Sequence, residues 1–168
     1  MGSDSLRDCF TTSFLNQEKK KAITFLRAGE IETEISYRQL HQDSNRMAAT
    51  LQELGVSKAD RVILCIQKSL IFVIAHLALQ KIGAIAVPLN PGFKPSEMTY
   101  LLDDADPKLI INDPEKGDMI SRIAPSCRLL PVDTRKPYQD VDFFGSASEG
   151  RIDVDLDPDD PGLIIYTS

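Results

Sequence analysis

Hydrophobic residues recur along this chain in two spacings, and the first is that of an amphipathic helix. Apolar residues at this spacing share one side of a helix that ends at Gly55: Leu40, Met47, Leu51 and Leu54. The residues just before it, from Ser36 to Gln39, have the form of a capping box. We expect the Ser36 side chain to accept from the Gln39 backbone amide, and the Gln39 side chain to reach back to Ser36.

The second spacing consists of short continuous apolar runs, which predict strands buried on both faces of a parallel sheet. The runs occupy residues 62–66, 84–88, 109–112 and 128–132. Helical patterns separate them: residues 70–82, which end at Gly83, residues 95–104, which begin at a proline, and residues 114–123. With right-handed crossovers, this order predicts an α/β fold: a doubly wound, mostly parallel sheet with helices on both faces.

The N-terminal region has a different pattern. Residues 6–18 carry apolar side chains at helical spacing, which predicts a first helix. Two short runs, 23–28 and 31–35, flank Gly29-Glu30 and predict a tight β-hairpin.

The pattern of residues changes again in the C-terminal region. From Thr134 to Asp160 the chain is polar and acidic with little periodicity, and a short apolar run, 163–166, then predicts a buried strand. We therefore expect an α/β subdomain over residues 1–133, followed over residues 134–168 by an acidic linker and a terminal strand.

Composition excludes several classes of protein. The 168 residues include 25 acidic and 19 basic side chains, for a formal charge of −6. Nucleic-acid binding needs a clustered basic face, and the one basic run, residues 19–21, is interpreted as a solvated helix end, so no nucleic-acid partner is expected. The three cysteines are widely spaced and odd in number, which indicates neither a disulfide framework nor a zinc site. We expect a reducing, cytoplasmic location, with Cys65 acting as a small buried hydrophobic residue.

Residues 70–89 are largely apolar, yet they do not predict a membrane span. A span needs about twenty apolar residues in one helix, and this stretch contains His76, Lys81 and Pro88. The pattern predicts a buried helix, a glycine stop and a buried strand. We therefore expect no integral membrane segment.

Three groups of polar residues invite a metal or catalytic interpretation. They are Asp153 with Asp155 and Asp157, Asp103 with Asp104 and Asp106, and the two histidines, His41 and His76. Pro158 replaces the glycine that a calcium-binding EF-hand loop requires, and the second group fits a solvated helix end. The histidines have no adjacent ligand pattern, and His76 on an apolar helix is interpreted as a core residue. The sequence thus predicts no metal site and no catalytic residue in this chain.

The predicted last strand leads into Thr167-Ser168, and this is how a phosphate-binding loop begins. Hydroxyl and backbone N–H groups at such a point can bind an anion. An ordinary strand explains the same residues, so the spacing alone does not decide between them. Thr167 and Ser168 are the candidate phosphate-binding residues.

Three segments resemble, in order and spacing, the adenylate-forming (AMP-binding) superfamily of acyl-CoA synthetases, nonribosomal-peptide adenylation domains and luciferases. Residues 159–168 (DDPGLIIYTS) are similar to the lead-in to its phosphate loop. Residues 35–40 (ISYRQL) resemble its first core helix and residues 83–91 (GAIAVPLNP) its second core motif. Asn90 stands where peptide adenylation domains usually carry aspartate, so the chain looks more like acyl-CoA synthetases. The malonyl-CoA synthetase-like and fatty-acid–CoA ligase members look most similar.

This resemblance implies that the chain is the N-terminal part of an acid–CoA ligase. Members of the family join a carboxylic acid to ATP as an acyl-adenylate, release pyrophosphate and transfer the acyl group to coenzyme A. Thr167 and Ser168 match positions that contact ATP phosphates in relatives. The loop lysine, the adenine-binding motif, the Mg²⁺-coordinating glutamate and the C-terminal lysine of the family match nothing in this sequence.

The same resemblance sets the expected ligands. The full enzyme would use ATP, Mg²⁺, coenzyme A and a small carboxylic acid in fatty acid metabolism, with a homodimer left open as its assembly. We expect this chain alone to bind none of these ligands and to be inactive.

Two other classes of function stay open at this point. One is a complete doubly wound binding module, flavodoxin-like or receiver-like, without ligase activity. A receiver would need an aspartate at the end of an early buried strand, and residues 65–68 contain none, whereas a flavin protein would be yellow. The other is an interaction or scaffold protein, because a fold alone does not determine function.

Overall fold

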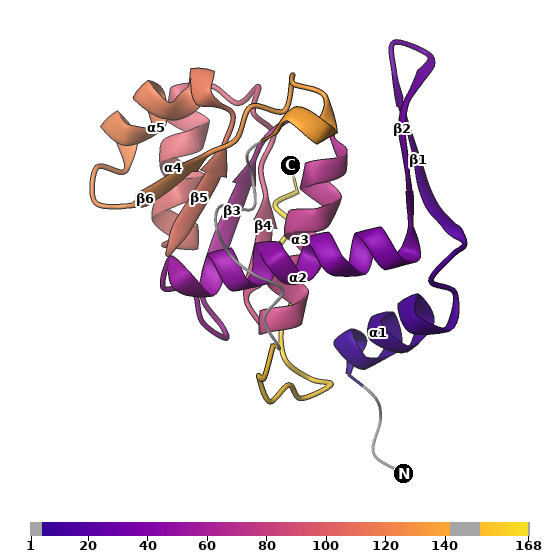
Figure 1. Cartoon of the computed structure of the whole chain (residues 1–168). Helices are drawn as coiled ribbons and strands as arrows, with labels where there is room; N and C mark the ends of the chain where they lie inside the picture. Colours follow the sequence, from indigo (N-terminus) through magenta and orange to yellow (C-terminus); the bar gives the residue numbers. More distant parts are fainter. Residues whose placement is uncertain (1–4, 142–151, 168) are drawn as a thin grey trace.

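A four-stranded parallel sheet forms the centre of the computed structural model, which describes residues 5–141 and 152–167 (Figure 1). The strand order is β4-β3-β5-β6. The chain adds β4 on one side of β3, then crosses back over β3 and adds β5 and β6 on its other side. Ile63 in β3 pairs with Val87 in β4 on one side and with Ile110 in β5 on the other. The strands are β3 (Arg61–Cys65), β4 (Ile85–Pro88), β5 (Leu109–Asn112) and β6 (Arg128–Pro131). This arrangement confirms the predicted doubly wound α/β fold.

Side chains alternate between the two faces of the sheet along each strand. In β3 both sets are apolar, and helices cover both faces. In β3, Val62 and Leu64 belong to the hydrophobic cluster formed with α2 and α3, while Ile63 and Cys65 belong to the cluster formed with α4 and α5. The continuous apolar run in this strand therefore fills two cores. The four helices are α2 (Tyr37–Glu53), α3 (Leu70–Ile82), α4 (Pro95–Ala105) and α5 (Gly117–Ile123).

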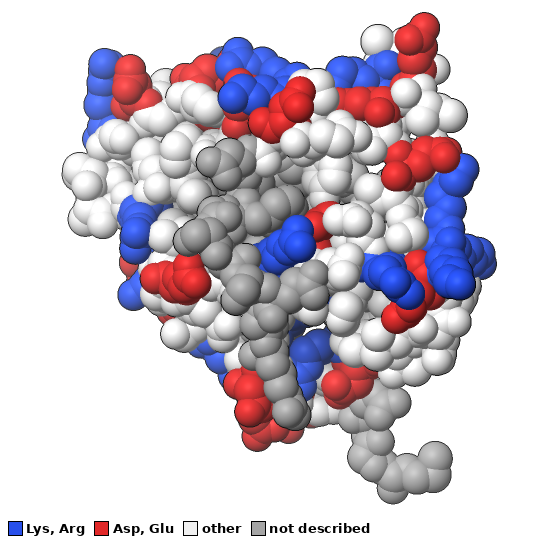
Figure 2. All heavy atoms as spheres, in the orientation of Figure 1, with Lys and Arg blue, Asp and Glu red and all other residues white. Residues whose placement is uncertain are grey.

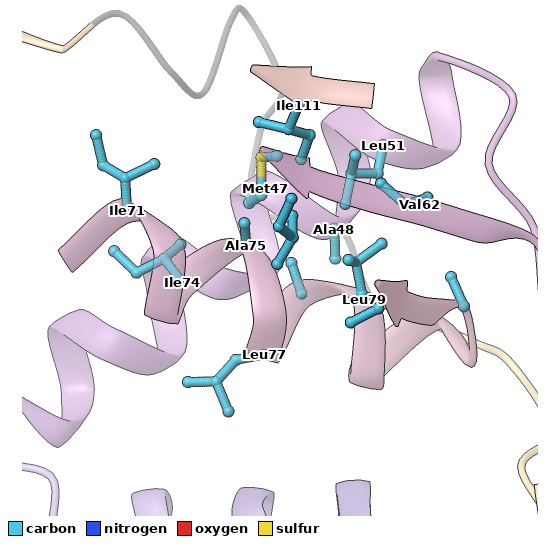
Figure 3. Close-up of a cluster of buried hydrophobic side chains, with 14 of the residues drawn as sticks. Met47, Ala48, Leu51, Val62, Ile71, Ile74, Ala75, Leu77, Leu79 and Ile111 are labelled. Carbon is cyan, nitrogen blue, oxygen red and sulfur yellow. The ribbon is translucent and has the colours of Figure 1, made fainter. Parts of the chain in front are cut away.

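The larger core lies where α2 and α3 pack against the sheet (Figure 3). Met47 and Leu51 from α2, Ile74 and Leu79 from α3, and Ile111 from β5 are all completely buried. These α2 residues are part of the apolar face that the sequence predicts, so its helical spacing correctly identified the buried side.

The N-terminal part forms a helix and a hairpin that projects away from the sheet (Figure 1). Helix α1 spans Leu6–Asn16, and strands β1 (Lys21–Arg27) and β2 (Glu30–Ser36) pair antiparallel. The hairpin loop is Ala28-Gly29 rather than the predicted Gly29-Glu30. Both loop residues have positive φ, 52° and 87°, which matches the twist that a two-residue hairpin loop requires.

The capping box predicted at the start of α2 is only half formed. The Ser36 side chain accepts from the Gln39 backbone N–H (3.2 Å), as expected, but the Gln39 side chain donates to Asp43 Oδ2 (2.9 Å) instead of reaching back. Helix α1 has the complete capping box, since Ser5 accepts from the Asp8 backbone and the Asp8 carboxylate accepts from the Ser5 N–H (3.1 Å).

The predicted buried strand over residues 163–166 is not present as such. The segment makes one isolated parallel bridge, Leu163 to Ala86 of β4, and the side chains of Leu163 and Ile165 are 45% and 65% exposed. The segment lies outside β4 and so covers the edge of the sheet. Apolar composition alone cannot distinguish such an edge position from a central strand.

The segment after β6 folds back over α2 and the hairpin. It contains a 3-10 turn, η2 (Tyr138–Asp140), whose Tyr138 hydroxyl donates to the buried Asp43 carboxylate of α2. The Gln139 side chain donates to Thr33 Oγ1 of β2 (3.2 Å). A second 3-10 turn, η1 (Pro114–Lys116), precedes α5.

Gly83, which ends α3 with φ 70°, leads to a first testable prediction. A Cβ added at this position would contact neighbouring side chains. That Cβ would be 2.5 Å from Leu156 Cδ2, whereas at Gly55, which ends α2 with φ 86°, no atom of the described residues lies within 4 Å. We expect Gly55→Ala to lower the free energy of unfolding by about 1–2 kcal/mol through backbone strain, and Gly83→Ala by about 1 kcal/mol more through overpacking. Urea unfolding of both variants measures the difference, and equal losses would show that Leu156 moves aside freely.

Candidate functional site

The carboxyl ends of the parallel strands lie at one edge of the sheet, where ligands bind in open α/β folds. Gln67 follows β3, Leu89 follows β4 and Asp113 follows β5. The Asp113 carboxylate accepts from the Gln67 backbone N–H (2.8 Å) and from Thr134. This edge is therefore held together by a buried carboxylate that receives backbone and hydroxyl donors.

Thr167, one of the two predicted phosphate-binding residues, reaches the same edge. The final segment runs parallel to β4 with Leu163 opposite Ala86, so Tyr166 and Thr167 extend beyond Pro88, the last residue of β4. In Figure 1 the last described residues, coloured yellow, lie beside β4. Thr167 is exposed, and Ser168 lies outside the described residues.

A hollow of about 430 Å³ lies between α4 and this final segment. Its lining includes Phe93, Glu97, Tyr100, Tyr166 and Thr167. Tyr100 is 68% exposed. The described lining combines aromatic rings, hydroxyl groups, one leucine and one carboxylate, without lysine or arginine. A phosphate beside Thr167 would therefore need its positive charge from elsewhere.

Tyr166 fixes the wall of this hollow to α4. Its hydroxyl donates to Asp104 Oδ2 (2.7 Å). Partial burial, together with this bond to a carboxylate, raises the pKa of Tyr166 to about 12. The phenol therefore stays protonated at physiological pH and can donate to Asp104.

Lys81, which in the sequence is only a polar residue within an apolar stretch, is a buried basic residue. Its side chain is 3% exposed between α2 and α3. Nζ donates to Ser44 Oγ (2.7 Å), Asn45 Oδ1 (2.7 Å) and the His41 carbonyl (3.1 Å), and no carboxylate of the described residues pairs with it. Helical spacing could have revealed the site, because Lys81 lies on the same α3 face as the buried Leu77.

The pKa of Lys81 leads to a second prediction. Burial lowers it from the ordinary 10.5 to about 7. Between these values the unfolded chain holds a proton that the folded chain does not, so stability falls as the pH decreases from 10.5 toward 7, by at most about 1.4 kcal/mol per pH unit. Lys81→Met lacks this dependence. We therefore expect the unfolding free energy of the wild type minus that of the variant to increase with pH.

Urea unfolding of both proteins at pH 7, 8 and 9 measures that difference. The contributions of titratable groups that both proteins share cancel in this difference. One such group is Cys65, because burial raises its pKa to about 11 in both. A difference that stays constant with pH would show that the three hydrogen bonds keep Lys81 protonated.

The other sequence candidates do not come together. Asp104 bonds Tyr166, Asp106 pairs with Arg61 (3.0 Å), and Asp153, Asp155 and Asp157 are exposed. Within residues 5–141 and 152–167, no three His, Cys, Asp or Glu side chains are grouped so that they could hold a metal ion.

His76, Cys65 and Cys9 differ in how far they are buried. His76 is only half-buried rather than a core residue, and burial lowers its pKa. Cys65 is completely buried, as predicted, and Cys9 is exposed.

Figure 2 shows basic and acidic side chains interspersed over the face in view. None of the helices in the described part of the chain is both long and apolar enough to cross a membrane.

Comparison with known proteins gives consistent matches. The family described as "AMP-binding enzyme" matches residues 10–168. The dimodular nonribosomal peptide synthase of Bacillus subtilis (strain 168) is 31% identical over 135 residues, 80% of this chain and 6% of that protein. The long-chain-fatty-acid–CoA ligase FadD13 of Mycobacterium tuberculosis is 30% identical over 138 residues, 80% of this chain and 27% of FadD13.

The similarity extends to three dimensions. The crystal structure of apo MatB from Rhodopseudomonas palustris superposes with a TM-score of 0.79 at 30% identity, over 96% of this chain and 32% of MatB. The chain thus spans a third or less of the length of each of these proteins.

Proposed function

This chain belongs to the AMP-binding enzyme family, and we propose that it is the N-terminal part of an acid–CoA ligase. The proposed enzyme activates a carboxylic acid with ATP as an acyl-adenylate, releases pyrophosphate and transfers the acyl group to coenzyme A. The similarity to FadD13, a long-chain-fatty-acid–CoA ligase, supports this reaction and a place in fatty acid metabolism. Because the chain belongs to this family, the alternative of a flavodoxin-like or receiver-like module has no support.

The observation that carries the proposal is the course of the final segment. It runs along β4 in the parallel direction and delivers Thr167 to the carboxyl edge of the sheet. There, the hydroxyls of Thr167 and Ser168 and the backbone N–H groups beside them would bind ATP phosphates. Charge on the phosphates repels an attacking carboxylate, so the reaction also needs Mg²⁺ or basic groups to screen it.

The residues present fit only part of this site. The described lining of the hollow beside Thr167 supplies hydroxyl groups but neither a basic side chain nor a cluster of carboxylates for Mg²⁺. We therefore propose that Mg²⁺, coenzyme A and the acid are bound by other parts of the enzyme. This chain alone would then be inactive.

The proposal includes the domain division, the location and the assembly. We assign residues 1–133 to the α/β subdomain and residues 134–168 to the linker and the start of the phosphate loop. The Val132 N–H donates to the Asn112 carbonyl (2.8 Å), which extends the pairing of β5 with β6 almost to this boundary. We also propose a cytoplasmic enzyme, with a homodimer as an assembly to be tested.

The decisive experiment measures carboxylate-dependent pyrophosphate release by the longer enzyme over a panel of acids. Thr167→Val, which removes only the hydroxyl, is expected to slow release by about 10²–10³-fold, the usual effect of losing one donor to developing charge. Thr12→Val, at an exposed position of α1, is the matched control. No release with any acid would contradict the ligase proposal.

A calorimetric titration tests the second part of the proposal on the 168-residue chain itself. We expect no binding of ATP–Mg²⁺ or coenzyme A. Micromolar binding of either would show that this chain holds a complete site.

The 31% identity to a nonribosomal peptide synthase favours a second candidate, in which the adenylate is transferred to a thiol other than coenzyme A. Product analysis separates the two. An acyl-CoA product supports the ligase, whereas an adenylate that forms but does not react with coenzyme A supports the alternative.

A further inference from the structure

The segment that carries Thr167 is held to the sheet by few backbone contacts. Within residues 152–167, only two backbone hydrogen bonds reach β4: Ala86 N–H to the Gly162 carbonyl (3.0 Å) and Ile164 N–H to the Ala86 carbonyl (2.9 Å). Backbone groups repeat along a strand, so two bonds of this kind could form equally well in another register. Something else must select the observed one.

Gln80 supplies a contact that does not repeat. This residue of α3 is 8% exposed, and its Nε2 donates to the Gly162 carbonyl (2.6 Å), the same oxygen that accepts from Ala86. A Cβ on residue 162 would lie 2.4 Å from Gln80 Oε1. The side-chain amide therefore occupies the space that the absence of a side chain at Gly162 provides, and the close approach is specific to this residue.

The register matters because it sets the positions of the residues after Gly162. A shift of two residues along β4 would move Thr167 by about 6.6 Å, since a strand rises about 3.3 Å per residue. A shift of one residue would turn the half-buried Ile164 and Tyr166 outward and break the Tyr166–Asp104 bond. A misplacement of about 1 Å at a reacting centre is enough to slow catalysis about 100-fold.

We propose that Gln80 is a positioning residue: its side-chain amide sets the register of residues 162–167 along β4 and so places Thr167 in the phosphate site. This inference rests on the proposed function for its catalytic consequence, but its structural part concerns this chain alone. The Lys58–Asp160 ion pair (2.6 Å) also holds this segment, just before Gly162. Because the pair is partly exposed to solvent, it contributes little to stability.

The structural part is tested on the 168-residue chain by hydrogen exchange. Gln80→Met keeps the length of the side chain and removes the donor. We expect exchange of the Ile164 and Ala86 amides to become at least about ten-fold faster, because protection follows local opening, while the Ile63 and Leu64 amides are unchanged. Gly162→Ala, which displaces the Gln80 amide without altering α3, should give the same result. Gln52→Met, at an exposed position of α2, is the matched control.

The catalytic part is tested on the longer enzyme by separating its two half-reactions. Gln80→Met should slow adenylate formation about 100-fold, while thioester formation from a supplied acyl-adenylate stays within about two-fold, because that step does not use the β- and γ-phosphates. A general folding defect would slow both half-reactions together.

The outcomes are distinct. Unchanged exchange at Ile164 in both variants, or an equal loss in both half-reactions, overturns the inference. Faster exchange in a protein whose wild type releases no pyrophosphate supports the register role of Gln80 and contradicts the proposed function instead.

Discussion

Leu79→Ala is expected to lower the free energy of unfolding by about 3–5 kcal/mol, the largest loss predicted for a single substitution in this chain. Leu79 is completely buried where α3 packs on α2 and β3, in the cluster that includes Ala48 and Val62 (Figure 3). The loss combines the transfer of the removed methyl groups with a cavity, because the rigid sheet on one side prevents full collapse.

Urea unfolding followed by far-UV circular dichroism measures this effect. Leu79→Met, which conserves volume, should cost less than about 1.5 kcal/mol. Leu15→Ala, at a side chain that is 54% exposed on α1, should stay within about 0.5 kcal/mol. A loss below about 2 kcal/mol in Leu79→Ala would mean that the core between α2 and α3 repacks around the missing side chain.

Asp113→Ala is expected to cost about 3 kcal/mol, because three hydrogen bonds depend on one buried carboxylate. Oδ2 accepts from the Gln67 N–H (2.8 Å), and Oδ1 accepts from the Thr134 N–H (3.2 Å) and the Thr134 hydroxyl. Thr134 is 3% exposed, so its N–H would be left buried without a partner. The carboxylate thereby links the end of β3 to the segment that leaves β6.

Thermal and urea unfolding, with two further variants, test this prediction. Asp113→Asn keeps one acceptor oxygen and should show an intermediate loss. Asp103→Ala removes an exposed carboxylate of α4 and should change stability by less than about 0.5 kcal/mol. If Asp113→Ala behaves like Asp103→Ala, water replaces the lost acceptor and the link between β3 and Thr134 is not a stabilising one.

Much of the middle of the fold was predictable because its signals are local. Continuous apolar runs mark strands that are buried on two faces, and Gly55 and Gly83 end helices with the positive φ that their sequence positions suggest. The strands at 62–66 and 109–112 agree with β3 and β5 to within one residue. The family resemblance of residues 35–40, 83–91 and 159–168 is confirmed by the match over residues 10–168.

Two of the errors share a cause, which is that the sequence pattern does not show what lies opposite a residue. The apolar run 163–166 predicted a buried strand, but its place at the edge of β4 leaves Leu163 and Ile165 exposed. Gln39 had the right spacing for a capping box, yet Asp43, one turn further along, takes its side chain. In both cases, the competing partner or neighbour is set by packing rather than by spacing.

Local signals in the sequence are enough to predict the alternation of strands and helices from β3 to β6, the buried sides of the helices, and the family. These follow from periodicity, from glycine and proline, and from ordered motifs, all of which act over a few residues. Three sets of contacts could be found only in the folded chain: those of Gln80 with Gly162, of Asp113 with Gln67 and Thr134, and of Lys81 with α2. Those contacts join residues that are 21 to 82 positions apart, and their geometry exists only after the sheet and its helices have packed.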